Sequence, residues 1–315
     1  MTALQTLRSQ NGHVPEHDHT KSSGKKLLAA TFLNLAITVA EIAGGLLSNS
    51  LALLSDALHN LGDGIAVFIA FMAHRVSNKG SSASKTFGYK RIEILAAFIN
   101  SVILVVICIF LIYQAILRLS HPAPIRGMIM FVVAAAGLLG NLAGVLILHS
   151  GSPDNLNIRA AYLHLLGDTL SSVVVILGGI MIYFSNANWI DPLITVLISL
   201  YILRETYQLL KESVDILMQA TPRKLSLEQI KREIEKNPEV LNIHHIHAWN
   251  LNDTEIHFEG HLDLREDLRI SKTEIVRGRI EKMLKEKYKI SHTTIQVEYG
   301  CCDDKEMIHK LQHKE

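Results

Sequence analysis

The sequence LHNLGD at residues 58–63 recurs, with one substitution, as LHLLGD at residues 163–168. Each copy lies within a long apolar stretch and places a histidine four residues before an aspartate. At about 100° per residue, two such side chains project from the same face of a helix, one turn apart. Ionisable groups inside a membrane-spanning helix cost on the order of 2.5–3.5 kcal/mol each, so two matching sets predict a functional site. The four residues are His59, Asp63, His164 and Asp168.

Two imidazoles and two carboxylates form a donor set that suits a tetrahedral divalent ion, above all zinc. Copper(I) would favour sulfur ligands, and magnesium or calcium would favour at least about six oxygen ligands. We therefore expect a metal site where two helices meet within a membrane. The alternative is that each histidine–aspartate pair forms an internal hydrogen bond and only holds the helices together.

Three further polar residues within the apolar stretches need separate treatment: Glu41, Asp56 and Asn141. Asp56 precedes His59 by three residues, so it is a candidate either for orienting that imidazole or for carrying a proton. Glu41 and Asn141 are candidates for lining an access path. For each of the three, a hydrogen bond between packed helices is an equal alternative, and we assign none of them as a metal ligand.

The composition indicates an integral membrane protein with a polar C-terminal part. Of its 315 residues, 49% are hydrophobic and 19% are charged, whereas soluble domains average about 25% charged residues. The net charge of +1 gives no overall basic field for binding nucleic acid. Six stretches are close to the ~20 residues that cross ~30 Å of hydrocarbon. They are residues 27–47, 51–73, 92–117, 127–148, 160–184 and 190–210.

The distribution of lysine and arginine predicts the orientation in the lipid bilayer. Positive residues are concentrated before the first stretch and between the second and third, whereas the opposite side has only Arg118 and Arg126. Because such residues are retained on the cytoplasmic side, we expect both termini in the cytoplasm and the protein in the cell (inner) membrane. Residues 1–26 form a cytoplasmic tail with His13, His17 and His19, either solvated or acting as a flexible metal-collecting arm.

Residues 211–300 predict a separate cytoplasmic α/β domain, followed by a polar tail at residues 301–315. Ser226 and Ser271 each begin a capping pattern typical of a helix N-terminus. Strands are expected at residues 240–249, 256–264 and 293–299. The order αββαβ predicts a small ferredoxin-like, two-layer domain, whose size makes pairing with a second copy plausible.

These features together resemble the cation diffusion facilitator family, in its zinc-type cation efflux branch. The segment FGYKRIE at residues 87–93 is similar to that family's loop before the third span, and the resemblance runs from about residue 26 to residue 298. It implies a homodimeric transporter, not an enzyme, that exports Zn²⁺ from the cytoplasm in exchange for protons through residues 27–210. Pairs that begin with histidine, as at His59, resemble the zinc-selective type, whereas an aspartate there more often also accepts cadmium.

Proton exchange also follows from the residues themselves. Histidine and aspartate bind a metal only when deprotonated, so metal binding releases protons. No Gly-rich nucleotide-binding loop is present, and the energy would therefore come from an ion gradient.

The resemblance further implies zinc, structural or regulatory, in the cytoplasmic domain. Its ligands would fall on His244 or a neighbour such as His247, on His261 and on Glu298, with Cys301 and Cys302 as further thiolate ligands. Strand alternation predicts His245 and His247 on one face and His244 on the other, so that a single ion could reach all of them only if a bulge intervened.

Three alternatives remain open at this point. The first is efflux of another divalent metal, such as Cd²⁺, Co²⁺ or Fe²⁺. The second is a membrane metallohydrolase, which would need an open coordination position and a general base, as in a His-Glu-x-x-His string that this chain lacks. The third is a metal sensor that signals through its tail.

Overall fold

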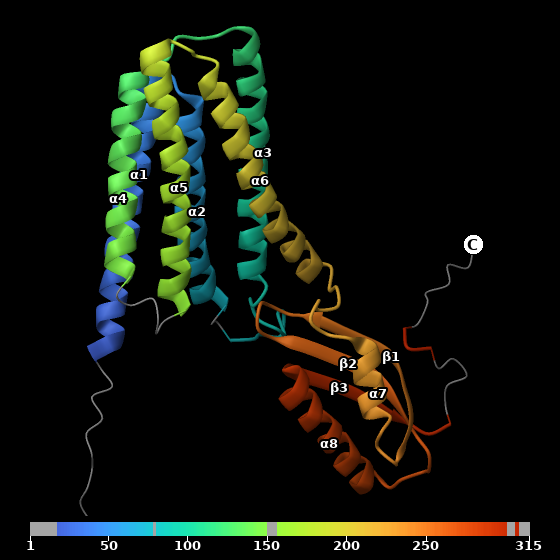
Figure 1. Cartoon of the computed structure of the whole chain (residues 1–315). Coiled ribbons are helices and arrows are strands. Elements are labelled where there is room, and N and C mark those ends of the chain that lie inside the picture. The colour runs from blue at the N-terminus through green and yellow to red at the C-terminus, as the bar shows by residue number, and fades with distance from the viewer. Residues whose placement is uncertain (1–17, 78–79, 150–155, 301–305, 309–315) are drawn as a thin grey trace, which may run out of the picture. The chain divides into compact units, whose positions relative to one another are not determined.

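A computed structural model describes residues 18–77, 80–149, 156–300 and 306–308 of the chain (Figure 1). The chain forms two compact units. The first comprises Met1–Gly64 and Val106–Leu203, and the second comprises Ile65–Val105 and Arg204–Glu315.

The N-terminal two-thirds of the chain is helical, as predicted. All six apolar stretches lie within helices. The last helix continues past its predicted end at residue 210 into the polar residues that follow, and ends at Leu217. The helices are α1 (Asp18–Ser48), α2 (Leu51–Ser77), α3 (Ile92–Ser120), α4 (Gly127–His149), α5 (Leu156–Ser185) and α6 (Ile190–Leu217).

Four segments in the described part of the chain are long and apolar enough to cross a membrane. They are Ile92–Ser120, Gly127–Leu146, Gly167–Ser185 and Ile190–Leu217. The described apolar segment of α1, Phe32–Ser48, is shorter. Helix α2 is not among them, and several of its side chains lie outside the described residues.

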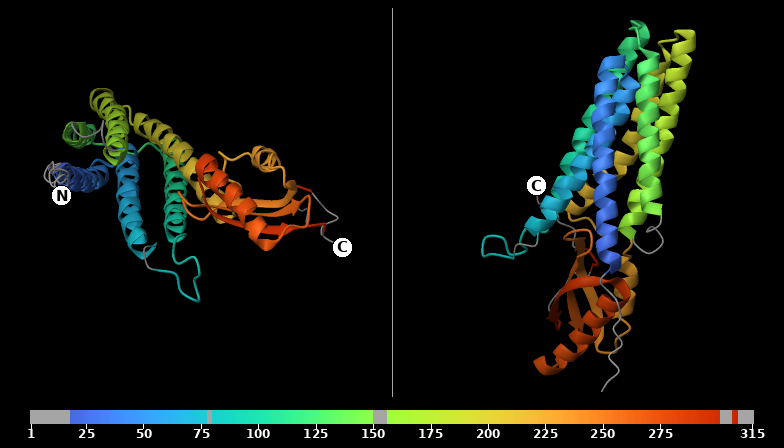
Figure 2. Two further views of the ribbon diagram at one scale, coloured as in Figure 1. Left: turned by 90° about the horizontal axis from the view of Figure 1, so that it is seen from below. Right: turned by 90° about the vertical axis from the view of Figure 1, so that its left-hand side faces the viewer.

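Small residues bring the helices of the first unit close together. Helices α1 and α4 lie side by side (Figure 2), and a Cβ atom at Gly137 would come within 2.4 Å of Glu41 Oε1. Between α4 and α5, a Cβ atom at Gly179 would lie 3.0 Å from the backbone nitrogen of Phe131. Lipid provides no hydrophobic drive for helix association, so such close backbone approach supplies much of the packing energy.

The C-terminal domain has the predicted αββαβ order. Its elements are α7 (Leu227–Ile234), β1 (Val240–Asn250), β2 (Ile256–Leu264), α8 (Ile270–Tyr288) and β3 (Ile290–Glu298). The sheet order is β1-β2-β3, with β1 antiparallel and β3 parallel to β2. Ile230 of α7 and Ile280 of α8 share one core with Phe258 of β2. Both helices therefore cover the same face of the sheet, which leaves the other face for polar side chains.

Two local predictions in this domain have different outcomes. Ser226 caps α7, because its hydroxyl accepts a hydrogen bond from the N–H of Gln229 at 3.3 Å. The prediction for Ser271 is wrong: α8 begins at Ile270, and its N-cap, Arg269, lies two residues before Ser271 and makes no side-chain capping bond. Helix α8 ends at Tyr288. The next residue, Lys289, has a left-handed φ of 59° that stops the helix and lets β3 begin at Ile290.

Candidate metal-transport site and cytoplasmic histidine cluster

Helix α2 carries the first predicted half-site. His59 and Asp63 lie one turn apart, with 3.5 Å between His59 Nε2 and Asp63 Oδ2. Both side chains are only slightly exposed, at 16% and 26%. The spacing of the motif thus places an imidazole and a carboxylate together on one helix face, as expected from the helical period.

Helix α5 carries the second half-site. Asp168 is buried, with 4% of its surface exposed. The backbone of His164 lies one turn earlier in α5, but its side chain is outside the described part of the structure. The four-ligand site therefore stays a prediction, with three of its side chains placed.

The buried polar residues around the α2 half-site connect helices. Asn60 donates a hydrogen bond from Nδ2 to Glu41 Oε2 of α1 at 3.1 Å. Asp56 accepts one from Ser171 of α5 at 2.6 Å. Asn141 of α4 is fully buried, and its side chain has no hydrogen-bond partner among the described residues. For Glu41 and Asp56, the structure thus shows hydrogen bonds between packed helices, the alternative to a role at the metal site or along an access path.

Asp191 is a buried residue that sequence reasoning missed. It lies at the start of α6, and its carboxylate accepts hydrogen bonds from the N–H groups of Leu51 and Ala52 at 2.9 and 3.2 Å. The Ser50 hydroxyl donates a third bond at 2.5 Å. Because the first N–H groups of a helix lack partners within the helix, Asp191 completes the N-terminus of the helix that carries His59. The sequence feature that could have identified this residue is an aspartate at the edge of an apolar stretch.

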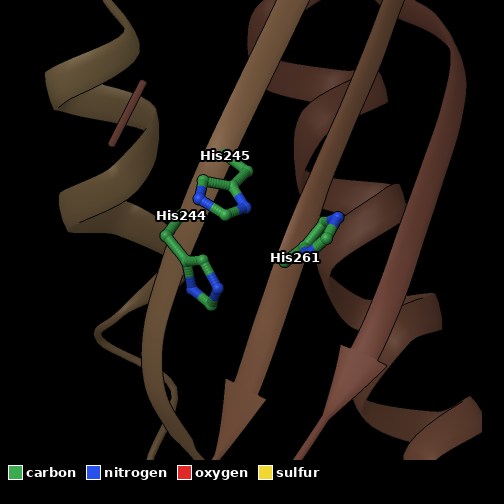
Figure 3. Close-up of side chains that lie close together, drawn as sticks. All are labelled: His244, His245 and His261. Atoms are coloured by element: carbon green, nitrogen blue, oxygen red, sulfur yellow. The ribbon is translucent and has the colours of Figure 1, made fainter. Parts of the chain in front are cut away.

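The C-terminal domain holds a second candidate site on the polar face of its sheet. His244, His245 and His261 point toward one another (Figure 3), and each offers a ring nitrogen within 4.8 Å of the other two. Glu298 at the end of β3 lies beside them, with Oε1 2.8 Å from His261 Nδ1 and Oε2 3.6 Å from His244 Nε2. Three imidazoles and a carboxylate are a donor set that suits zinc.

A β-bulge assembles this histidine cluster. His244 pairs with His261 and His247 pairs with Glu259, so two β1 residues stand opposite one β2 residue. His245 takes a positive φ of 48°, and Ile243 and Ile246 both point into the core. Strand alternation alone would separate His244 from His245, but the structure contains the bulge that the sequence analysis named as the exception, and the bulge breaks the alternation.

His247 is not one of the three clustered histidines. Its side chain is exposed and lines a cavity of about 370 Å³ together with His245 and His261 of the cluster. Cys301 and Cys302 lie outside the described residues. Just beyond them the chain returns to the bulge, where the N–H of Ile246 donates to the carbonyl oxygen of Met307 at 2.8 Å.

Burial affects the protonation of His244. It lowers the pKa of His244, although the neighbouring Glu298 acts in the opposite direction. A lower pKa keeps the imidazole neutral near pH 7, and the neutral form is the one that binds a metal.

Comparison with known proteins matches both parts of the chain. Residues 27–218 match the cation efflux transmembrane domain, and residues 222–299 match the cytoplasmic domain of cation efflux proteins. The chain belongs to the cation efflux family. It is therefore a membrane transporter of cations, and the metallohydrolase alternative is excluded. The family match confirms the resemblance drawn from the repeated motif.

Several bacterial relatives of this cation efflux protein are similar over most of its length. The zinc transporter ZitB of Pectobacterium atrosepticum is 43% identical over 291 residues, which cover 91% of this chain and 90% of the relative. The cadmium, cobalt and zinc/H(+)-K(+) antiporter of Bacillus subtilis is 40% identical, covering 90% and 91%. The metal cation efflux system protein CzcD of Cupriavidus metallidurans is 37% identical, covering 93% and 91%.

Proposed function

We propose that this cation efflux protein exports Zn²⁺ from the cytoplasm in exchange for protons. The transport site would comprise His59 and Asp63 of α2 with His164 and Asp168 of α5. The observation that carries the proposal is the close histidine–carboxylate pair on α2, matched by the same motif on α5, where Asp168 is buried. Four such donors fill the tetrahedral coordination that zinc prefers.

Proton exchange follows from the chemistry of these donors. An imidazole or carboxylate must lose its proton before it binds the ion, so each arriving ion displaces protons and each departing ion allows them to return. The name of the Bacillus subtilis relative, an antiporter, supports this coupling. With its termini in the cytoplasm and its helices in the inner membrane, the protein would move Zn²⁺ out of the cytoplasm against its gradient. The inward flow of protons would supply the energy.

Cadmium and cobalt are the second candidate substrates, because the name of the Bacillus subtilis relative includes them. His59 favours zinc over cadmium. Imidazole nitrogen is a ligand that suits zinc, and a pair that begins with histidine resembles the zinc-selective type of the family.

We also propose that the histidine cluster binds a structural or regulatory zinc ion. His244, His245, His261 and Glu298 would supply its ligands, because they already lie within reach of one another. The match to the cytoplasmic domain of cation efflux proteins supports a homodimer that pairs through this part of the chain. His247, Cys301 and Cys302 remain candidate ligands.

Zinc flux in proteoliposomes tests the transport proposal. His59→Ala and Asp168→Ala should each abolish zinc uptake driven by a proton gradient, while the variants still insert and pair. His121→Ala, an exposed histidine at the end of α3, is the matched control and should transport normally. A protonophore should also stop uptake. Retained flux in the first two variants would exclude these residues as ligands.

A further inference from the structure

A hydrogen bond joins the two helices that carry the repeated motif. The hydroxyl of Ser171 in α5 lies 2.6 Å from Asp56 Oδ1 in α2. The same hydroxyl lies 2.9 Å from the carbonyl oxygen of Asp168 in its own helix. Asp56 is 1% exposed, so this bond is shielded from water. A hydrogen bond to a carboxyl group is stronger in such a buried place than at the surface.

The bond lies directly beside the proposed ligands of both helices. Asp56 comes three residues before His59, and Ser171 comes three residues after Asp168. Helices α2 and α5 run antiparallel (Figure 1), so both residues are displaced one turn from the ligands toward the same end of the helices. The Asp56–Ser171 bond therefore connects the two half-sites at a common level.

A metal site shared by two helices needs such a connection. Zinc–ligand distances lie near 2.0–2.2 Å, whereas moving one helix by a single residue shifts its side chains by about 1.5 Å along the axis and about 100° around it. Lipid does not push helices together, so packing and polar bonds set their rotation and register. A bond one turn from the ligands therefore restrains the rotation and the register of the two helices close to the metal site.

We propose that Asp56 and Ser171 are positioning residues for the transport site. Their hydrogen bond holds α2 and α5 in the rotation and register at which the two half-sites face each other, whether or not an ion is bound. The inference rests on the proposed function, because it takes His59, Asp63, His164 and Asp168 as the ligands.

Two other roles for Asp56 make different predictions. If Asp56 acted only by orienting the His59 imidazole, Ser171 would be dispensable. If the bond served only general stability, any buried hydroxyl contact of α2 would matter equally. The chain offers such a contact: Ser55 of α2 lies 3.4 Å from the buried Ser199 of α6, hydroxyl to hydroxyl. Ser199→Ala is therefore the matched control.

The test is an equilibrium zinc titration of the purified full-length protein. The transport-site signal is the part of the binding that His59→Ala removes. Ser171→Ala and Asp56→Ala should each weaken it about 10-fold, the lower end of the usual cost of losing a group that supports metal ligands. The double variant should bind no more weakly than either single variant, because both remove the same bond.

Conservative replacements separate positioning from folding. Ser171→Thr keeps the hydroxyl and Asp56→Asn keeps an acceptor oxygen, so both should retain affinity within about 3-fold, a difference below the usual cost of losing such a group. Ser199→Ala should leave zinc affinity unchanged. Melting temperatures, measured alongside, should change similarly in Ser171→Ala and Ser199→Ala.

Each contrary outcome has a distinct meaning. Unchanged affinity in Ser171→Ala would overturn the positioning role while leaving the transport site in place. Independent, multiplying losses in the double variant, or an equal loss in Ser199→Ala, would do the same. Absence of any His59-dependent zinc binding in the unmodified protein would overturn the proposed transport site and, with it, this inference.

Discussion

Asp191 and Leu51 join the start of α6 to the start of α2, with the Asp191 carboxylate 2.9 Å from the Leu51 nitrogen. The N–H groups at a helix start have no partner within the helix, and the apolar surroundings of a membrane protein supply none. The carboxylate of one helix thus completes another, and the completed helix carries His59 and Asp63.

Replacement of Asp191 with alanine should destabilise the protein. The substitution removes three hydrogen bonds from a fully buried site, and leaving buried donors without partners costs about 1–3 kcal/mol. We expect a clearly lower melting temperature for the purified protein. Asp215→Ala, which removes an exposed ion pair with Arg223 at the other end of α6, should cost less than about 1 kcal/mol. Equal effects would show that Asp191 does not act as a helix cap.

Replacement of His59 with aspartate should relax metal selectivity. The change replaces an imidazole nitrogen with a carboxylate oxygen at the same position of α2 and weakens the nitrogen-based preference for zinc. We expect a higher ratio of cadmium to zinc transport in proteoliposomes, with zinc transport reduced but measurable. Asp63→Glu, which keeps both donor types, should leave the ratio near that of the original protein. An unchanged ratio in His59→Asp would remove His59 from the account of selectivity.

The cytoplasmic cluster predicts unequal roles for neighbouring histidines. His245→Ala should remove one zinc ion per chain from the protein, because His245 belongs to the three-histidine cluster. His247→Ala, two residues along β1, should keep that ion because His247 lines the same cavity but is not one of the three clustered histidines. Metal analysis after dialysis, with the transport site disabled by His59→Ala, would count the ions. Loss of zinc in His247→Ala but not in His245→Ala would contradict the bulge as the organiser of the site.

His257 of β2 should make the protein sensitive to acid. It is buried against Trp249, and burial lowers the pKa of His257 below its ordinary 6.5. The unfolded chain then binds a proton at a higher pH than the folded protein does. The contribution of the neutral, buried His257 to the stability of the protein is therefore complete above about pH 6.5 and is lost as the pH falls below that value. The other groups that act on His257 are His292, Lys90 and Arg91, which lower its pKa, and Glu255, which raises it.

The melting temperature of the full-length protein at about pH 7.5 and about pH 5.5 tests this expectation, since the two values bracket the histidine pKa. It should fall toward acid, and the fall should be smaller in His257→Leu, which cannot be protonated. Part of the fall should remain, because burial also lowers the pKa of His244. His121→Leu, at an exposed histidine, should leave the difference unchanged. An equal fall in His257→Leu would show that this side chain does not cause the sensitivity.

The sequence by itself determined most of the architecture. Apolar stretches of membrane-spanning length matched helices α1–α6, because hydrocarbon thickness imposes a length that is visible in composition. The αββαβ order was equally visible, because strand and helix periods differ. The same helical period placed His59 beside Asp63, since residues four apart share a helix face whatever surrounds them.

Only the tertiary structure decided which polar groups meet across elements. The bulge in β1 brought His245 to the side of His244, which no alternating pattern predicts because a bulge depends on the pairing of two strands. Asp191 accepts hydrogen bonds from Leu51 and Ala52, some 140 residues away in the chain. Asp56 accepts one from Ser171. Such contacts depend on how helices pack in three dimensions, and the period of a single segment carries no information about its neighbour's rotation or register.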